Sequence, residues 1–160
     1  MHMKSILSTL DFLQQHIEGS LPSNAVTEMQ YPTAISELLG FRIIAIAKGK
    51  ATLEVCTDPS IHGNQQGTVH GGFLGELADA AIGTAHSTAI DTGESFTSID
   101  LQIKFFRPVW KSKLTATVFP VRAGRTVSHY QCEITREDGQ LVALASGTIM
   151  TLRGDLALGR

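Results

Sequence analysis

Apolar side chains recur at helical spacing near the start of the chain and at strand spacing over much of the rest. Residues 4–17 carry one apolar face and predict an amphipathic helix, which the sequence GSLP at 19–22 ends. A short helical turn is predicted at 35–39, where Gly40 stops it. The first forty residues therefore predict a small helical lead-in.

Six later runs have the composition and the boundaries of strands. They cover residues 41–47, 51–57, 97–106, 114–121, 126–135 and 141–152. Short loops join consecutive runs, and such loops favour antiparallel pairing. The sequence thus predicts an α+β fold with one main helix, about six strands and a short amphipathic helix in front.

The run at 97–106, TSIDLQIKFF, shows the clearest alternation of apolar and polar positions. Strict alternation predicts a strand with one dry face and one polar face. The dry face would carry Thr97, Ile99, Leu101, Ile103 and Phe105, and the polar face Ser98, Asp100, Gln102 and Lys104.

Residues 58–67 are rich in turn formers and predict a loop, and a long helix is predicted at 72–86. That helix is poor in bulky side chains, and each of its glycines costs about 1 kcal/mol relative to alanine. Its small residues are Gly75, Ala78, Ala80, Ala81, Gly83 and Ala85. A helix with so many small side chains fits inside a curved sheet better than on a flat one.

Asp79 lies about 140° around this helix from Leu74, at the flank of the apolar stripe. Helix geometry alone leaves two interpretations open. The carboxylate is either a solvated surface group or a functional one.

Composition and charge exclude several classes of protein. The 160 residues suit one domain with an ordinary globular composition, and a net charge of −2 without a basic run gives no nucleic-acid surface. No segment reaches the roughly 18 apolar residues of a membrane span, and the start of the chain does not resemble a signal peptide. A cytoplasmic location is expected by elimination.

The cysteines and histidines do not predict a disulfide framework or a metal site. Cys56 and Cys132 both fall in apolar strand-like runs, and we expect buried, reduced thiols. The spacing of His62, His70 and His86 fits no zinc pattern, even with Asp79 added, so no metal is expected.

Several motifs in order give a resemblance to a known family. They are Asn64, GTVHGG at 67–72, Leu77-x-Asp79, IDLQIKFFRPV at 99–109, AGRT at 123–126 and ASGTIM at 145–150. Together they resemble the hot-dog fold acyl-CoA thioesterases of the PaaI-like group. The resemblance implies a long helix wrapped by a curved antiparallel sheet. It also implies a homodimer or homotetramer with active sites at the subunit interface.

The resemblance implies a hot-dog domain at 40–152, preceded by the lead-in at 1–39 and followed by a tail at 153–160. It also implies hydrolysis of an acyl- or aryl-CoA thioester to the free acid and CoA, with CoA as part of the substrate and no further cofactor. A thiolate leaves readily because free thiols have a pKa of about 8.5, so a carboxylate suffices as the central group.

The resemblance assigns site residues by position in this sequence. Asp79 would act as nucleophile or general base, and the backbone N–H of Gly71 would stabilise the oxyanion. Asn64 would orient the water or the thioester, although an asparagine in a loop is also a common turn former. His70 would hold the loop and the helix start, with the role of a general base as the alternative. Ser98 would assist the water, with Thr97 as the alternative if the register differs by one.

Arg125, Arg107 and Arg122 are candidates for the phosphates of CoA, since the guanidinium suits phosphate. Scattered arginines are also common as solvated surface groups. One subgroup of the family has a threonine one helical turn after its acid, where this chain has Gly83. Phe73, Leu74 and Phe96 are expected to line an apolar pocket, but they do not distinguish aryl from aliphatic acyl groups.

Two rival functions remain. One is a hot-dog hydratase or dehydratase that acts on acyl thioesters, whose catalytic histidine lies in a differently built motif. The other is a non-catalytic acyl-CoA-binding protein. Regulators of that kind usually carry a DNA-binding segment, and residues 1–39 show no helix-turn-helix pair.

Overall fold

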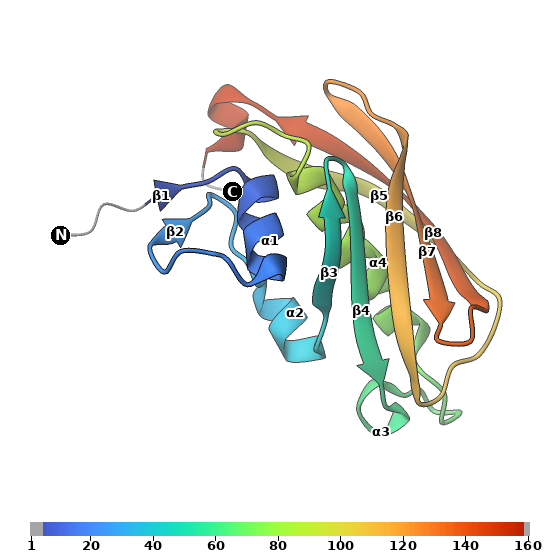
Figure 1. Ribbon diagram of the computed structural model, residues 1–160. Coiled ribbons are helices and arrows are strands. Elements are labelled where there is room, and N and C mark those ends of the chain that lie inside the picture. Colours follow the sequence, from blue (N-terminus) through green and yellow to red (C-terminus); the bar gives the residue numbers. More distant parts are fainter. Residues whose placement is uncertain (1–4, 159–160) are drawn as a thin grey trace.

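A computed structural model describes residues 5–158, and its N-terminal part is a small helical layer beside the main sheet (Figure 1). Helix α1 spans Thr9–Glu18, later than the predicted start at residue 4, which lies outside the described residues. The helix starts there because the Ser8 hydroxyl accepts a hydrogen bond from the Asp11 N–H at 3.1 Å. The preceding residues form β1 (Ser5–Ile6), which pairs in parallel with β2 (Ala25–Val26).

The chain then makes the predicted short helix and the first hairpin. Helix α2 (Ala34–Leu39) ends at Gly40, whose φ of 76° is left-handed. Strands β3 (Arg42–Ala47) and β4 (Lys50–Thr57) pair in antiparallel fashion. The loop expected after them contains one helical turn, α3 (Pro59–His62), because the Asp58 carboxylate accepts the Ser60 N–H at 2.9 Å and caps it.

Four long strands complete an antiparallel sheet of six strands, which confirms the predicted fold class. They are β5 (Ser95–Phe105), β6 (Ser112–Arg122), β7 (Val127–Arg136) and β8 (Leu141–Leu152), and a 3₁₀ turn, η1 (Gly154–Ala157), follows. The strand order is β3-β4-β6-β7-β8-β5. Strands β3 and β5 are therefore the two edges of the sheet.

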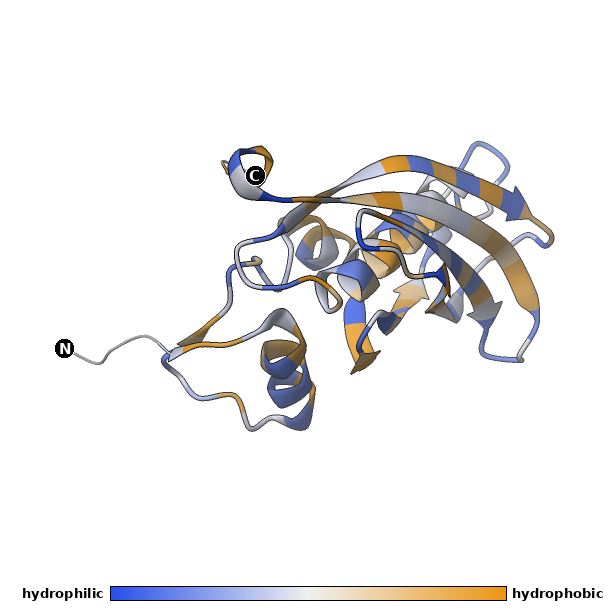
Figure 2. Ribbon diagram, turned by 90° about the horizontal axis from the view of Figure 1, so that it is seen from above, coloured by the Kyte–Doolittle hydropathy of each residue, from blue (hydrophilic) through white to orange (hydrophobic). Residues whose placement is uncertain are grey.

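Helix α4 (Gly71–Ser87) lies in the concave face of this curved sheet (Figure 2). Its residues Leu77, Ala78, Ala81 and Ala85 are fully buried against the strands. The small residues let helix and sheet approach closely, as predicted. Gly75 is different, because nothing within residues 5–158 lies within 4 Å of a Cβ placed there.

A β-bulge in β5 corrects the predicted alternation of that strand. Ser98 pairs with Ile149 and Asp100 with Thr148, so Ile99 is an extra residue. Directly opposed residues share a face of the sheet, and Ile149 is buried. Ser98 therefore faces α4. Leu101, Ile103 and Phe105 lie on that face as predicted, whereas Phe96 and Ser98 take the places predicted for Thr97 and Ile99.

The prediction of two buried thiols is half wrong. Both cysteines are free, but Cys56 is exposed because the neighbouring Val55 and Thr57 take the inward positions of β4. Cys132 is buried, and burial raises the pKa of its thiol to about 12.

Candidate active site

The loop before α4 holds the side chain of Asn64 in place. Its Oδ1 accepts hydrogen bonds from the N–H groups of Gln66 and Thr68 at 2.9 and 3.2 Å. Its Nδ2 donates to the Thr68 hydroxyl at 3.0 Å. Thr68 was not among the predicted site residues. Its position in the sequence between Asn64 and His70 could have indicated that it belongs to this loop. Asn64 is both a turn former and a fixed polar group.

His70 is the N-cap of α4. Its Nδ1 accepts the Gly72 N–H at 2.8 Å, and its carbonyl oxygen accepts the N–H groups of Phe73 and Leu74. Its own N–H donates to the His62 carbonyl oxygen at 2.7 Å. These bonds fix the loop and the first turn of the helix. They leave Nδ1 occupied as an acceptor.

Gly71 differs from its neighbours in the same turn. Among residues 5–158, its N–H has no hydrogen-bond acceptor, whereas Gly72, Phe73 and Leu74 are all satisfied by His70. Unpaired N–H groups at a helix N-terminus favour negative charge. Gly71 also lines a hollow of about 380 Å³, whose other residues are Asn64, Val69, Leu74 and Phe105 to Val109. The structure thus brings Asn64 and Gly71 to one hollow.

Asp79 and Ser98 form a second group. Asp79 is half-buried on α4, and the Ser98 hydroxyl donates to its Oδ1 at 3.4 Å. This contact exists because the bulge turns Ser98 inward, while Thr97 takes the opposite face. Burial, and then the nearby Asp79 carboxylate, raise the pKa of Glu76 one turn earlier on the helix.

The two groups are separate within one chain. Asp79 follows Gly71 by eight residues, which places it about 12 Å further along the helix axis. One chain alone therefore does not bring Asp79 to the free N–H of Gly71.

The three candidate arginines do not converge. Arg107 borders the hollow at Gly71 and donates from Nη1 to the Leu141 carbonyl oxygen at 2.7 Å. Arg125 lines another hollow, of about 320 Å³, at the far end of α4 beside His86. Arg122 is exposed at the end of β6. Within residues 5–158, no three His, Cys, Asp or Glu side chains gather as they would around a metal ion.

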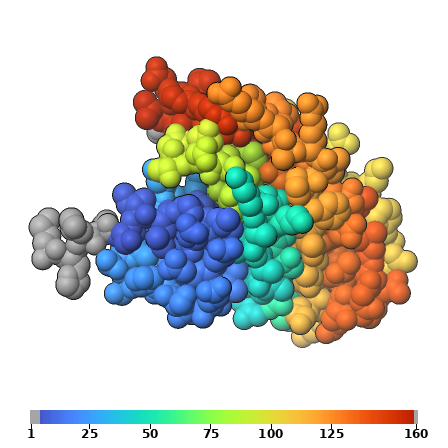
Figure 3. Space-filling model, turned by 45° about the horizontal axis from the view of Figure 1, so that its top comes forward, coloured from blue at the N-terminus to red at the C-terminus, as the bar shows by residue number. Residues whose placement is uncertain are grey.

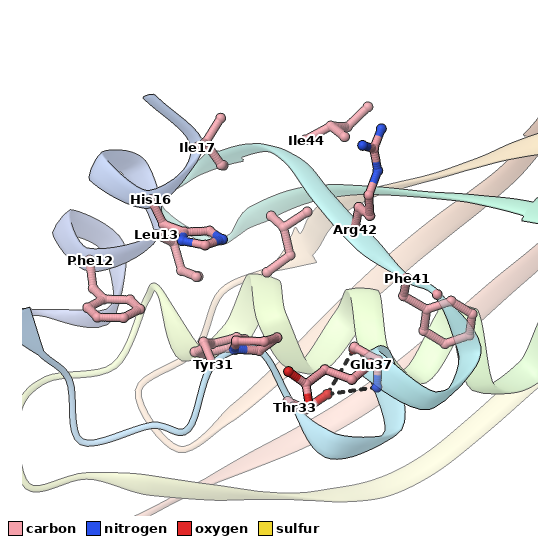
Figure 4. A pocket seen from close by; sticks show the side chains of 14 residues that line it. Phe12, Leu13, His16, Ile17, Tyr31, Thr33, Glu37, Phe41, Arg42 and Ile44 are labelled. Carbon is pink, nitrogen blue, oxygen red and sulfur yellow. Dashed lines mark hydrogen bonds between the residues drawn. The ribbon is translucent and has the colours of Figure 1, made fainter. Parts of the chain in front are cut away.

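A larger pocket than the hollow at Gly71 lies elsewhere. This open pocket measures about 640 Å³ and lies between α1, α2 and β3, with Leu13, Tyr31 and Phe41 among its walls (Figure 4). None of the predicted site residues lines it. Figure 3 shows the N-terminal segment packed beside the β3–β4 hairpin, away from the strands that follow α4. The apolar face of the predicted first helix was the one sequence feature that pointed to this pocket.

The three residues expected to line one apolar pocket lie at different places in the structure. Leu74 lines the hollow at Gly71, Phe73 stacks on His62, and Phe96 packs on His86 with ring centroids 5.2 Å apart. Phe105 lines the hollow although it was expected only as part of a dry strand face.

No helix within residues 5–158 combines the length and the apolar character that a membrane crossing requires.

The chain is similar to known hydrolases over most of its length. A sequence model of the thioesterase superfamily matches residues 66–143. A protein of Deinococcus radiodurans, provisionally named an esterase, is 32% identical over 123 residues that cover 74% of this chain and 81% of that protein.

Two further relatives are also similar to this chain over most of its length. The medium/long-chain acyl-CoA thioesterase YigI of Salmonella typhimurium is 28% identical, over 75% of this chain and 86% of that protein. A variant of the phenylacetic acid degradation protein PaaI from Thermus thermophilus is 30% identical, with a TM-score of 0.68 over 74% of this chain and 98% of that one. The chain therefore belongs to the thioesterase superfamily, and it is a thioester hydrolase with the hot-dog fold.

Proposed function

We propose that this protein hydrolyses acyl-CoA thioesters to the free carboxylic acid and CoA. One observation carries the proposal: Gly71, whose N–H has no acceptor among residues 5–158, lines the same hollow as Asn64, at the start of the helix that bears Asp79. Acyl transfer requires such a donor where negative charge develops on the carbonyl oxygen.

In this proposal the thioester carbonyl oxygen accepts the Gly71 N–H. The α4 dipole favours the oxyanion that forms there. Asp79 either attacks the carbonyl carbon itself or removes a proton from the attacking water, and Ser98 holds the carboxylate or the water. The C–S bond breaks, and CoA leaves as a thiolate that takes up a proton. Where Asp79 itself attacked, a water molecule then cleaves the acyl–Asp79 anhydride and returns the free acid and the Asp79 carboxylate. No cofactor takes part.

The separation of about 12 Å along α4 supports a site shared by two copies of the chain. A homodimer or homotetramer would place the Asp79 of one copy opposite the Gly71 of another. Strand β5 supports this arrangement, since it is an edge of the sheet and carries exposed apolar side chains at Ile99 and Phe105, and the exposed Phe106 follows directly after it.

The phosphates of CoA are assigned to arginine side chains, with Arg107 nearest the hollow and Arg125 and Arg122 at the other end of α4. In one protomer, Arg107 and Arg125 lie too far apart to hold the same phosphate, so an assembly would combine them from different copies. A cytoplasmic location stays an expectation.

The test is thiol release, followed colorimetrically, from a panel of aryl- and aliphatic acyl-CoAs. Asp79→Asn keeps the volume of the side chain and removes its charge. We expect turnover to fall roughly 100-fold or more, because a positioned carboxylate contributes at least that factor. Asp155→Asn, an exposed carboxylate in η1, is the control and should retain full activity.

Other outcomes separate the alternatives. Turnover unchanged in a folded Asp79→Asn variant would keep the enzyme and remove this role of Asp79. Saturable binding of an acyl-CoA without thiol release from any substrate would instead favour a non-catalytic acyl-CoA-binding protein or a hydratase.

A further inference from the structure

The ring of Phe105 lies directly against Gly71. A Cβ placed on Gly71 would lie 3.1 Å from Cζ and 3.3 Å from Cε1 of this ring, closer than ordinary van der Waals contact. Gly71 has no positive φ, so its backbone does not require glycine. The ring of Phe105 is therefore what requires the absence of a side chain at this position.

The backbone of Phe105 is fixed while its ring is half exposed. Phe105 pairs with the buried Ala143 of β8, and the next residue donates its N–H to the Val142 carbonyl oxygen at 2.8 Å. Because Ala143 is buried, Phe105 lies on the α4 side, as the alternation of the strand predicted. Yet 52% of Phe105 remains exposed, although it is the last residue of a well-paired strand. The ring is thus held as one wall of the hollow without being buried in the core.

Helix geometry relates the position of the Phe105 ring to the direction of the Gly71 N–H. In an α-helix the Cα–Cβ bond leans toward the N-terminus, and the N–H groups point that way too. An oxygen bound to the Gly71 N–H would therefore lie beside the Phe105 ring. The carbon next to the bound carbonyl would then lie in the hollow that Phe105 and Leu74 both line.

We propose that Phe105 is a specificity residue that excludes acyl groups branched at the carbon next to the thioester carbonyl. A straight acyl chain presents a methylene at this point, whereas a branched one presents an additional methyl group toward the ring. The inference rests on the proposed thioesterase function and adds a substrate class to it, namely unbranched acyl-CoAs.

The test compares two acyl-CoAs with the same number of carbons, hexanoyl-CoA and 2-methylpentanoyl-CoA, and then isomer pairs at the chain length that the protein hydrolyses fastest. The wild type should prefer the straight isomer in kcat/KM by roughly 10-fold or more, since one methyl group in an apolar pocket is worth about 10–200-fold. Phe105→Ala should reduce that preference at least 10-fold, mainly by improving the branched substrate.

Trp110→Ala is the matched control, because Trp110 is a similarly exposed aromatic residue (54%) that does not line the hollow. It should leave the preference unchanged. A Phe105→Ala variant that is folded and active but keeps the wild-type preference would overturn the inference alone. Absence of CoA release from every substrate with the wild type would instead overturn the proposed function.

A second measurement tests the contact without relying on substrate choice. Gly71→Ala keeps the N–H donor but adds a methyl group against the ring, so kcat/KM for hexanoyl-CoA should fall. In the Phe105→Ala background the same substitution should cost much less, because the opposing atoms are gone. Equal losses in both backgrounds would show that the ring does not limit this space.

Discussion

Single residues in this protein are placed by partners far away in sequence, and His86 is the clearest case. Only 2% of it is exposed, and its Nδ1 and Nε2 lie 3.0 Å from the hydroxyl oxygens of Tyr130 and Thr151. A neutral ring suits these two hydroxyls, since one nitrogen donates and the other accepts. Burial lowers the pKa of His86 to about 4.

This buried ring predicts a loss of stability in mild acid. In the unfolded chain the imidazole titrates near 6.5, whereas in the native state it stays neutral down to about 4. Between these values the unfolded state binds more protons, so stability falls as the pH is lowered. The contribution of His86 to the free energy of unfolding should fall by about 2 kcal/mol between pH 7.5 and pH 5.

Urea denaturation at both pH values and at fixed protein concentration measures the change. His86→Gln can still form hydrogen bonds but does not titrate, and its stability should depend less on pH by about the same amount. An equal pH dependence in wild type and variant would assign the acid sensitivity to other groups.

At the scale of elements, the distance between α4 and the sheet depends on a glycine in the strand as well as on the small residues of the helix. A Cβ on Gly147 of β8 would lie 3.1 Å from Cδ1 of Ile82 and 3.5 Å from its Cγ2. Ile82 is buried in the core. Gly147 therefore allows the helix to lie this close to the strand.

Gly147→Ala should destabilise the fold by about 1–3 kcal/mol, because overpacking moves a buried side chain from its place. Ile82→Val removes Cδ1 and alone should cost about 0.5–1.5 kcal/mol. The double variant should be more stable than the sum of the single changes predicts, when unfolding in urea is measured. Additive losses would mean that Gly147 is constrained by something other than Ile82.

At the scale of the whole molecule, the chain leaves one flank of α4 uncovered. Gly75 would have open space around a Cβ, so its cost to the helix is not offset within residues 5–158. It lies one turn before Asp79 on the flank that the proposed second copy would occupy.

Gly75→Leu should leave the single chain folded but weaken the assembly, because a large side chain keeps the second helix from approaching. Mass measurement by light scattering should show a shift toward the monomer, and thiol release should fall with it. Gln14→Leu adds the same side chain to the exposed face of α1 and should change neither. An unchanged mass for Gly75→Leu would place the interface elsewhere.

Local interactions in the sequence determined much of this protein. Helix ends follow from nearby groups, such as the Ser8 cap of α1 and Gly40 after α2, and periodicity identified the main helix and six strands. The motifs from Asn64 to ASGTIM at 145–150, taken together, identified the family, because their order and spacing are set along the chain itself.

Only the tertiary structure decided which side chains meet. The bulge at Ile99 put Ser98, in place of Thr97, on the α4 side beside Asp79, and it is invisible in the alternation because an extra residue in one strand appears only in its pairing with another. The fold also decided that Cys56 is exposed on β4, and that Arg107 and Arg125 line different hollows. Side-chain direction and distance across a sheet depend on register, and register is fixed by partners that lie far away in the sequence.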